Sequence, residues 1–537
     1  MAFIYIHYKQ YDDNKKIIGG IGSIKKSIYE KGKKYHSKQI TVEHLGKVLY
    51  LSDDKKSGIF DSPTRGLVEY NVLNNSFVNV SIDDPRIKNK PITYAPKVHT
   101  IFGDTYLLLE FMKNIDLIDV LRKTFPSNMD FEKALVHLAH DIMRDSSHIS
   151  CDNFVLKSFI SYLVPNLNLS SLKTDSRFFK KMGDDDVKLT FFKEFIKSMR
   201  KKYTKFGKAT YVDSTPLPND IVNNPFNALC SHGLTTTSVQ MRLVLILDQE
   251  TGLPVWYEII PGNILDINTL LTITGDVYSS LDIQISDYVL DAGYVFKEVI
   301  QAFHNGCEKT IIARMPAKKG YPYKELYRNT KDLFQKGKYQ FKRGDYTYFG
   351  IQRCINIFDL PIYEYVYLDH YSATKGFNLY LERHKDDFIK MKDKDKDFQM
   401  VKEGFFILVS NIDKTPQEIL KDYYGRTDIE KVFKTAKEYL RLLPIQKWND
   451  ETVRGKILTD IISTIIFLSI KKTLKDYSNV SIAEIIGASQ SLMCFKDNNI
   501  VTVETPNKKV KEYYQYLGIN IPGQIDLNDY KKTIDEI

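Results

Sequence analysis

Two aspartates end short apolar runs that are typical of β-strands in this 537-residue sequence. Asp213 ends the run 209–212, and Asp291 follows the run 285–290, 78 residues after Asp213. In open α/β sheets, functional side chains gather at the carboxyl ends of strands. For either aspartate alone a turn or helix cap is the more common role, so the pair needs a third element to indicate a site.

A third carboxylate lies in a predicted long helix, 416–442, that opens with a helix-capping pattern at 415–418. Spacings of 3, 4 and 7 place four polar residues along one face of this helix: Tyr423, Arg426, Glu430 and Lys437. A face packed on a core should be apolar, so this face indicates function. Arg426 and Glu430 alone could be an exposed ion pair of about 0.3–0.5 kcal/mol, which leaves Tyr423 and Lys437 unexplained.

The order of these residues resembles the Tyr–Arg–Glu–Lys signature of DDE transposases of the insertion-sequence-four type. Four segments carry the resemblance: Tyr423-x2-Arg426-x3-Glu430-x6-Lys437, Asp213-Ser214-Thr215, Asp291-Ala292-Gly293-Tyr294 and Leu443-Pro444-Ile445. It extends from about residue 208 to 470, is weaker before residue 208, and is absent after about residue 477. It implies an α/β, ribonuclease H-like fold: a mixed five-stranded sheet with flanking helices, interrupted by a β-rich insertion.

The resemblance also implies the chemistry. It makes Asp213, Asp291 and Glu430 the catalytic metal ligands, and carboxylate oxygens suit Mg²⁺. Two such ions, about 3.5–4 Å apart, activate an attacking oxygen and stabilise a leaving one; Mn²⁺ is expected to substitute. The implied reaction cuts the ends of an insertion sequence and joins their 3′-hydroxyls to target DNA. Arg426 and Lys437 are implied to hold phosphates, and Tyr423 to position DNA or pack beneath the site.

Changes in hydrophobic period divide the chain around these residues. We expect an N-terminal β-rich module at 1–95 and a helical, DNA-binding module at 96–207. The catalytic core is expected in two parts, 208–317 and 404–475, separated by a β-rich insertion at 318–403. Residues 476–537 are expected to form a C-terminal tail region.

Positive charge is concentrated just before the first catalytic strand. The whole chain has 76 Lys and Arg against 67 Asp and Glu, a net charge of +9, and the run 193–208 has seven against one. Its centre is Arg200, Lys201 and Lys202, and Tyr203 and Phe206 interleave as stacking side chains in a nucleic-acid groove can. An isolated basic run is usually a solvated helix face, but its position ahead of Asp213 predicts DNA contact.

Several protein classes are excluded by composition. The chain is 43% hydrophobic and 27% charged, as folded globular chains are. The N-terminus lacks the apolar stretch of a signal peptide. The most apolar run, 461–470, is too short to cross a bilayer, which needs about 20 residues, so this run predicts a buried core helix. Five scattered cysteines indicate no disulfide framework, and we expect a cytoplasmic, nucleoid-associated prokaryotic protein.

The expected partners are double-stranded DNA, as terminal inverted repeats and target, and a second copy of the chain, because two DNA ends must be paired. Two other functions remain open: a transposase-derived DNA-binding protein without catalysis, and a structure-specific nuclease on the same core. Three intact carboxylates argue against the first, and the Tyr–Arg–Glu–Lys helix argues against the second. No helix-turn-helix signature identifies which N-terminal module reads the DNA ends.

Overall fold

The chain divides into two compact units, Met1–Lys97 (unit 1) and Val98–Ile537 (unit 2). The computed structural model describes residues 2–12, 15–29, 37–62, 65–81, 84–87, 99–143, 151–165, 167, 176–218, 224–229, 239–262, 281, 287–290, 301, 310–317, 321–357, 360–425, 427–439, 442, 443, 445, 447, 449–477 and 480–535. Within these residues no helix is long and apolar enough to cross a bilayer.

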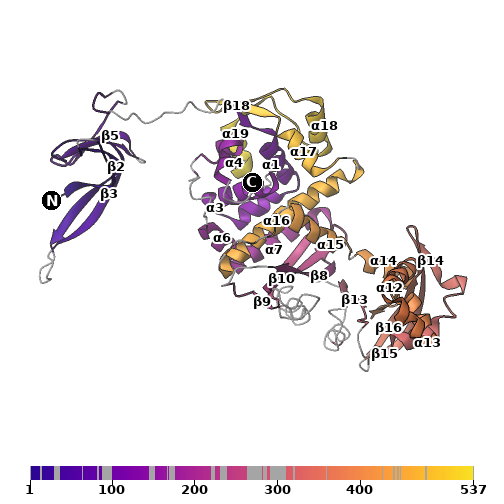
Figure 1. Cartoon of the computed structure of the whole chain (residues 1–537). Coiled ribbons are helices and arrows are strands. Elements are labelled where there is room, and N and C mark those ends of the chain that lie inside the picture. The colour runs from indigo at the N-terminus through magenta and orange to yellow at the C-terminus, as the bar shows by residue number, and fades with distance from the viewer. Residues whose placement is uncertain are drawn as a thin grey trace. The chain divides into compact units, whose positions relative to one another are not determined.

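Unit 1 is a six-stranded antiparallel sheet whose strands follow chain order (Figure 1). Its strands are β1 (Ala2–Tyr11), β2 (Ile17–Tyr29), β3 (Ser37–Leu51), β4 (Ser57–Ser62), β5 (Gly66–Asn71) and β6 (Ser76–Asn79). Alternation turns Ile4, Ile6 and Ile24 to one face, where they pack with the fully buried rings of Phe60 and Tyr70. Unit 1 therefore has its own core.

Unit 2 begins with a helical module. Its elements are β7 (Thr100–Ile101), α1 (Gly103–Asn114), α2 (Leu117–Thr124), α3 (Asn128–Met143), α4 (Cys151–Lys157), α5 (Ile160–Leu163), α6 (Ser176–Met182) and α7 (Asp185–Lys202). An ion pair between the buried Lys188 and the partly exposed Glu258 joins α7 to the sheet: Lys188 Nζ lies 3.0 Å from Glu258 Oε1 and 4.1 Å from the ring of Trp256. Burial lowers the pKa of Lys188 although Glu258 opposes that shift.

A mixed sheet forms the centre of unit 2. Its first strands are β8 (Ala209–Pro218), β9 (Ala228–Leu229), β10 (Val239–Asp248), β11 (Pro254–Pro261), β12 (Asp287–Leu290) and β13 (Thr310–Arg314). Five of them run in the order β11-β10-β8-β12-β13. β8 pairs antiparallel with β10 and parallel with β12, so it is hydrogen-bonded on both sides. β10 and β11 pair antiparallel as a hairpin.

The sheet continues beyond five strands into the predicted insertion. That region contains α11 (Tyr323–Thr330), the 3₁₀ turn η5 (Gly337–Tyr339), β14 (Gln340–Arg343), β15 (Tyr346–Ile357), β16 (Leu360–Asp369), α12 (His370–Lys390) and α13 (Asp393–Val401). Through β17 (Phe405–Ser410), strands β16, β15 and β14 extend the core sheet to ten strands, β9 included.

The region predicted as a β-rich insertion contains helices beside these strands, and α12 alone is 21 residues long. Ala373 is the one residue of α12 that is buried, so most of the helix surface is not packed against the sheet. Its start is fixed by Asp369, whose carboxylate accepts hydrogen bonds from the backbone N–H groups of Tyr371 and Ser372.

The chain after the core, which includes the predicted C-terminal tail region, is folded. The elements that follow β17 are α14 (Pro416–Gly425), α15 (Thr427–Lys434), the π-helical turn η6 (Thr435–Tyr439), α16 (Asp450–Thr473), the 3₁₀ turn η7 (Leu474–Asp476), α17 (Ile482–Ser489), β18 (Met493–Asp497), β19 (Ile500–Val503), α18 (Lys508–Tyr516), β20 (Gln524–Asp526) and α19 (Leu527–Asp535). β18, β19 and β20 form a sheet with β7, so the last residues close the helical module.

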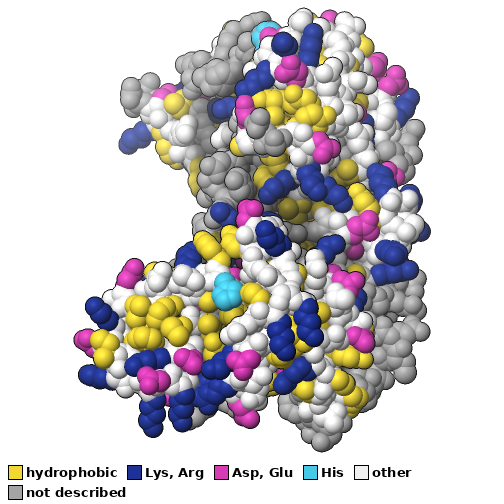
Figure 2. Space-filling view, turned by 90° about the vertical axis from the view of Figure 1, so that its right-hand side faces the viewer, with side chains coloured by type: hydrophobic (Ala, Val, Ile, Leu, Met, Phe, Trp, Pro, Cys, Tyr) yellow, Lys and Arg dark blue, Asp and Glu magenta, His cyan; other side chains and the backbone are white. Residues whose placement is uncertain are grey.

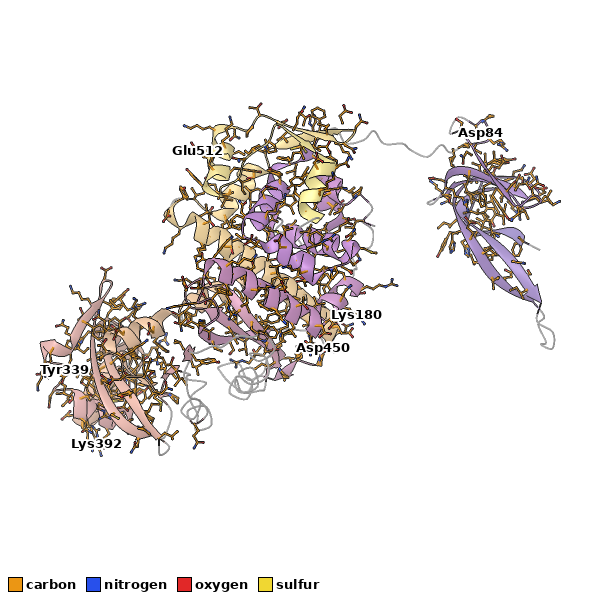
Figure 3. All side chains as sticks on the ribbon, turned by 180° about the vertical axis from the view of Figure 1, so that it is seen from behind. Asp84, Lys180, Tyr339, Lys392, Asp450 and Glu512 are labelled. Carbon is orange, nitrogen blue, oxygen red and sulfur yellow. The ribbon has the colours of Figure 1, made fainter. Side chains whose placement is uncertain are left out.

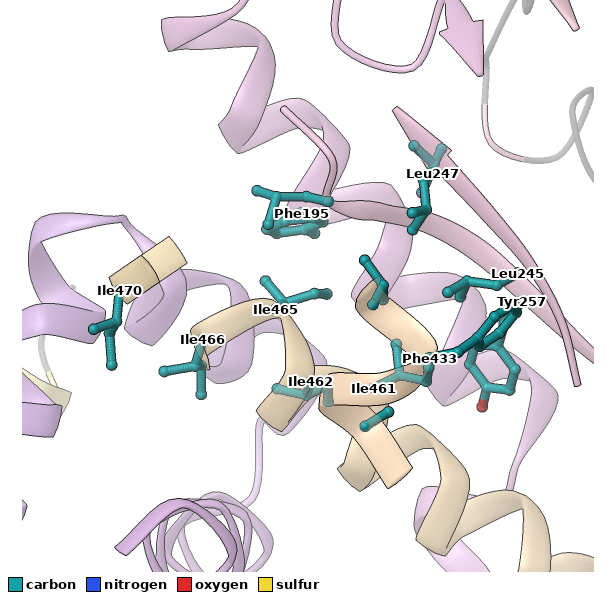
Figure 4. Packing of buried hydrophobic residues seen from close by; sticks show 14 of the residues in the cluster. Phe195, Leu245, Leu247, Tyr257, Phe433, Ile461, Ile462, Ile465, Ile466 and Ile470 are labelled. Atoms are coloured by element: carbon teal, nitrogen blue, oxygen red, sulfur yellow. The ribbon is translucent and has the colours of Figure 1, made fainter. Parts of the chain in front are cut away.

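The long helix α16 is the centre of the unit 2 core. Its isoleucines, including Ile461 and Ile465, are almost completely buried, which confirms the predicted core helix. Figure 4 shows them packed toward α7, the β10 and β11 strands and α15, with the labelled rings of Phe195 and Phe433 beside them. One helix thus supports the sheet, the helical module and α15 together.

Two glycines allow α16 to cross α6 at close range. A Cβ at Gly455 would overlap the carbonyl oxygen of Phe179, and a Cβ at Gly183 would overlap that of Glu451. Figure 3 shows Lys180 and Asp450 near each other at this crossing, where Lys180 Nζ also pairs with Glu451 Oε2 at 2.8 Å. The crossing fixes the start of α16.

Gly455→Ala should destabilise unit 2 by about 1–3 kcal/mol, because the added methyl overpacks a backbone contact. Helix propensity alone predicts the opposite sign. The matched control is Gly487→Ala in α17, where a Cβ meets nothing within 4 Å and should stabilise by about 0.5–1 kcal/mol. Both tryptophans lie in unit 2, so urea unfolding followed by tryptophan fluorescence reports this unit. Equal stabilisation by both substitutions would contradict the close crossing.

Candidate active site

Asp213 lies in the middle of one face of β8. Side chains alternate along a strand, so Tyr211, Asp213 and Thr215 share a face. Asp213 is partly exposed, whereas Tyr211 and Thr215 on either side of it are buried at 7% exposure each. The backbone N–H of Ser214 donates to Asp213 Oδ1 at 2.8 Å. The strand therefore presents one accessible carboxylate between two packed neighbours.

The first packed neighbour contacts the end of α14. A Cβ at Gly425 would overlap the hydroxyl group of Tyr211, so only a glycine lets the helix approach the strand this closely. Tyr211 is buried and cannot move aside without disturbing the core. This contact fixes the start of the segment that carries Glu430.

The second packed neighbour is tied to η6. Lys437 Nζ donates to Thr215 Oγ1 at 2.6 Å and to the carbonyl oxygen of Pro216 at 2.9 Å. Both acceptors are neutral, and burial lowers the pKa of Lys437. An ammonium has three N–H groups, so two are used by β8. The cation is thus held against the strand two residues from Asp213.

Glu430 lies on the helical segment between these two contacts. It is exposed, and it makes no ion pair or hydrogen bond with any residue in the described part of the chain. α15 itself packs against β8. Because both neighbours of Asp213 contact the segment 425–437, the strand carboxylate and the helix carboxylate belong to the same interface.

The predicted continuous helix is divided into α14, α15 and a π-helical turn. Its start is as predicted: Thr415 Oγ1 accepts from the Glu418 backbone N–H at 3.3 Å, and Glu418 Oε2 accepts from the Thr415 backbone N–H at 2.9 Å. The π-turn at 435–439 changes the phase after Glu430. Regular 3.6-residue spacing therefore does not continue from Glu430 to Lys437, which lies within the π-helical turn.

The other predicted site residues are placed as follows. Tyr423 is 4% exposed, so its ring is buried in the core rather than directed outward. Asp291 and Arg426 lie outside the described residues. Among the residues that the structure describes, no three His, Cys, Asp or Glu side chains are grouped to hold a metal, which leaves Asp213 and Glu430 as the described part of the predicted triad.

The basic run before β8 is only partly available to a ligand. Lys202 Nζ lies 3.4 Å from Asp116 Oδ2, and Arg200 Nε donates to the carbonyl oxygen of Phe206 at 3.3 Å. Lys201 is exposed. Phe206 is fully buried, edge-on to Phe195, so its predicted stacking role is wrong. Its regular spacing with other apolar residues was the signal that favoured the core.

A groove of about 680 Å³ lies on another side of α15. Its walls come from the β10–β11 turn, α15, the end of α16 and the start of α17. Lysines border it and hydrophobic residues form its floor: Lys431, Lys471, Lys472, Lys475, Val432, Phe467, Leu468, Leu474, Val480 and Ile482. On the face in Figure 2, Lys and Arg side chains gather around a hollowed, partly hydrophobic region.

Sequence reasoning missed Tyr211, Thr215 and Gly425 as positioning residues. Strand alternation around Asp213 identifies the first two, but nothing in a single sequence pairs them with residues more than 200 positions away. The lysines at the end of α16 look like ordinary helix-terminal cations, and only the fold brings them to the groove.

Residues 209–465 match the family model described as the transposase DDE domain. This segment is similar to a transposase DDE domain. The match spans the strand with Asp213 and the helix with Glu430, and it supports a DDE transposase. We refer to residues 209–465 as the DDE segment.

No curated protein is significantly similar to the chain. Among solved structures, a piggyBac transposase in a synaptic complex with hairpin DNA matches 80% of this chain and 85% of the other, at 10% identity and a TM-score of 0.34. A similarity at that level carries no argument about the fold or the function of the DDE segment.

The effects of Thr215→Val and Lys437→Met on the free energy of unfolding should not be additive. Each removes the hydrogen bond between β8 and η6, so the double variant should lose less than the sum of the single losses, with a coupling of about 0.5–3 kcal/mol. The control pair is Thr215→Val with Lys421→Met, an exposed lysine of α14 that should be additive. Tryptophan-detected urea unfolding measures both cycles. Additivity in the first cycle would show that the Lys437 contact does not hold the segment.

Proposed function

We propose that this chain is a DNA transposase of the insertion-sequence-four type that cuts the ends of an element and joins their 3′-hydroxyls to target DNA. The observation that carries the proposal is the interface between β8 and the segment 425–437. It brings the strand of Asp213 and the helix of Glu430 together by contacts on both sides of Asp213. The family match over the same residues supports it.

The sheet order supports a ribonuclease H-like core for the DDE segment. An antiparallel β8-β10-β11 meander is followed by β12 and β13, which run parallel to β8. Every Cα pair between β8 and β12 joins residues 78 positions apart, from Ala209–Asp287 to Tyr211–Val289. Asp213 and Asp291 are separated by the same number, which supports Asp291 as the third ligand.

The donor set fits a hard divalent cation. Asp213 and Glu430 offer carboxylate oxygens, and the nearby Lys437 ammonium is directed to neutral oxygens rather than to either acid. With Asp291 they would hold two Mg²⁺ ions, which supply charge stabilisation for in-line phosphoryl transfer and can be replaced by Mn²⁺.

The chain's own residues would bind and orient the DNA. Lys437 has a third N–H group for a phosphate oxygen beside Asp213. Arg426 is the second proposed phosphate ligand, and Tyr423 supports the helix from below. Pairing two element ends calls for two copies of the chain, and Arg200, Lys201 and Lys202 are proposed to contact flanking DNA in the cytoplasm of a prokaryotic host.

Asp213→Asn and Glu430→Gln should each reduce cleavage by more than about 100-fold, because losing a metal ligand should exceed the 10–100-fold effect of outer-shell changes. The substrate is duplex DNA carrying the sequences that flank the gene, incubated with Mg²⁺ or Mn²⁺. Affinity for the same DNA without metal should stay near that of the unaltered chain.

The matched control is Asp386→Asn, an exposed carboxylate on α12 of the DDE segment, which should cleave normally. Full cleavage by either site variant would overturn the proposal. An unaltered chain that binds the flanking DNA but never nicks it would favour the DNA-binding protein without catalysis.

A further inference from the structure

Most of the net positive charge of the chain lies in unit 1. Residues 1–97 contain 17 Lys and Arg against 10 Asp and Glu, a balance of +7 within the +9 of the whole chain. The basic run before β8 is offset by acidic residues elsewhere in unit 2. A small unit with this charge attracts polyanions more strongly than the chain average suggests.

One face of the three long strands of unit 1 carries cations and aromatic rings, and on the next strand, β4, the acid Asp61 lies opposite Lys47. The strand registers place nine residues on the face opposite the Ile4, Ile6 and Ile24 core: Phe3, Tyr5, His7, Ile21, Ser23, Lys25, Thr41, His44 and Lys47. We name this the β1–β3 face. The nearby Glu43 pairs with Ile24 on the opposite face and accepts from Arg65 at 2.9 Å.

Part of the β1–β3 face is exposed, although Ser23 within it is fully buried. Tyr5 and Ile21 are 36% and 45% exposed, and His44 and Lys47 are also exposed. Lys25 Nζ lies 3.7 Å from the centre of the Tyr5 ring. Neither Lys25 nor Lys47 forms an ion pair with a residue that the structure describes, and Lys47 is exposed opposite Asp61.

Tyr8 extends this face at a strained position. A register shift between His7 and Gln10 marks a β-bulge, and Tyr8 has φ of 51°. A bulky residue in the left-handed region is uncommon and costs energy. Yet the ring is 84% exposed, so packing within unit 1 does not repay that cost. Bulges redirect side chains, and this one exposes an aromatic ring whose centre lies 6.5 Å from that of His7 on the β1–β3 face.

We propose that the β1–β3 face, together with Tyr8, is a second DNA-binding surface that contacts the duplex outside the DDE site. Lys25 and Lys47 bind phosphate oxygens, and the tyrosine rings pack on sugars and exposed base edges. A second copy of the chain fits poorly, because a twofold interface would set lysines of one copy against those of the other. The inference rests on the proposed function only in taking DNA as the ligand.

The test measures duplex affinity of the full chain against salt concentration. Lys25→Gln/Lys47→Gln should weaken binding and reduce the slope of log K against log salt by about 1 for each lysine. The control Lys55→Gln/Lys56→Gln removes the same charge from the β3–β4 turn of unit 1 and should leave the slope unchanged. The proposal would be overturned if the two lysine pairs changed DNA affinity and salt slope equally, or if neither pair changed them. It would also be overturned if Lys25→Gln/Lys47→Gln changed the self-association of the chain but not its DNA affinity.

Tyr8→Gly separates recognition from folding. Glycine adopts a φ of 51° without strain, so the thermal stability of unit 1 should hold or rise while DNA affinity falls about tenfold with the lost ring contact. Unchanged DNA affinity of Tyr8→Gly would show that Tyr8 is not part of the DNA-binding surface. The same measurement is repeated with single-stranded DNA of the same sequence. If the chain binds the single strand more tightly than the duplex, and Tyr8→Gly loses that preference, the proposal that the ligand is duplex DNA would be overturned.

Failure of this inference and failure of the proposed function are distinguishable. Glu430→Gln should bind duplex DNA normally, and Lys25→Gln/Lys47→Gln should still cleave at saturating protein concentration. If the chain never cleaves DNA but the lysine-pair variant binds it more weakly, DNA binding by the β1–β3 face is supported and the transposase function is contradicted. If the chain cleaves DNA and the lysine-pair variant binds it with unchanged affinity, the transposase function is supported and DNA binding by the β1–β3 face is contradicted.

Discussion

The close packing of Gly425 on Tyr211 is the contact on which the arrangement of the DDE segment depends. A side chain at residue 425 would overlap the tyrosine hydroxyl and lift α14 and α15 from β8. Seven residues beyond Glu430, Lys437 ties η6 to Thr215 and Pro216. Two attachments, one on each side of Asp213, align a helix against a strand more firmly than one attachment would. The two acids are held by packing rather than by bonds to each other.

The elements around this interface hold both β8 and α15 in place. β8 is hydrogen-bonded to β10 on one side and β12 on the other, so the strand with Asp213 is not at an edge. α16 packs beneath α15 and the β10–β11 strands, and its close crossing with α6 links it to the helical module. The Lys188–Glu258 pair fastens α7 to the same sheet. A site on such elements is positioned more accurately than one on loops.

The sequence predicted the elements with strong local signals. The capping pattern at Thr415 and the buried helix at 461–470 were confirmed, since each depends on neighbours in the chain. Other features depend on tertiary packing. The π-turn near Lys437 has no sequence signal, α12 buries only Ala373, and the folded C-terminus depends on pairing with β7, almost 400 residues earlier. The Gly425–Tyr211 contact is equally non-local.

Shared metal binding by Asp213 and Glu430 can be measured directly with Fe²⁺ in place of Mg²⁺. Bound Fe²⁺ with ascorbate and peroxide generates hydroxyl radicals that cut the nearest polypeptide backbone, and the fragments map the metal site without any DNA. Cleavage next to both residue 213 and residue 430 is expected in the unaltered chain, with both cuts lost in Glu430→Gln. Cuts near one residue alone, or a cut near Asp213 that persists in Glu430→Gln, would show that the two carboxylates do not form one site.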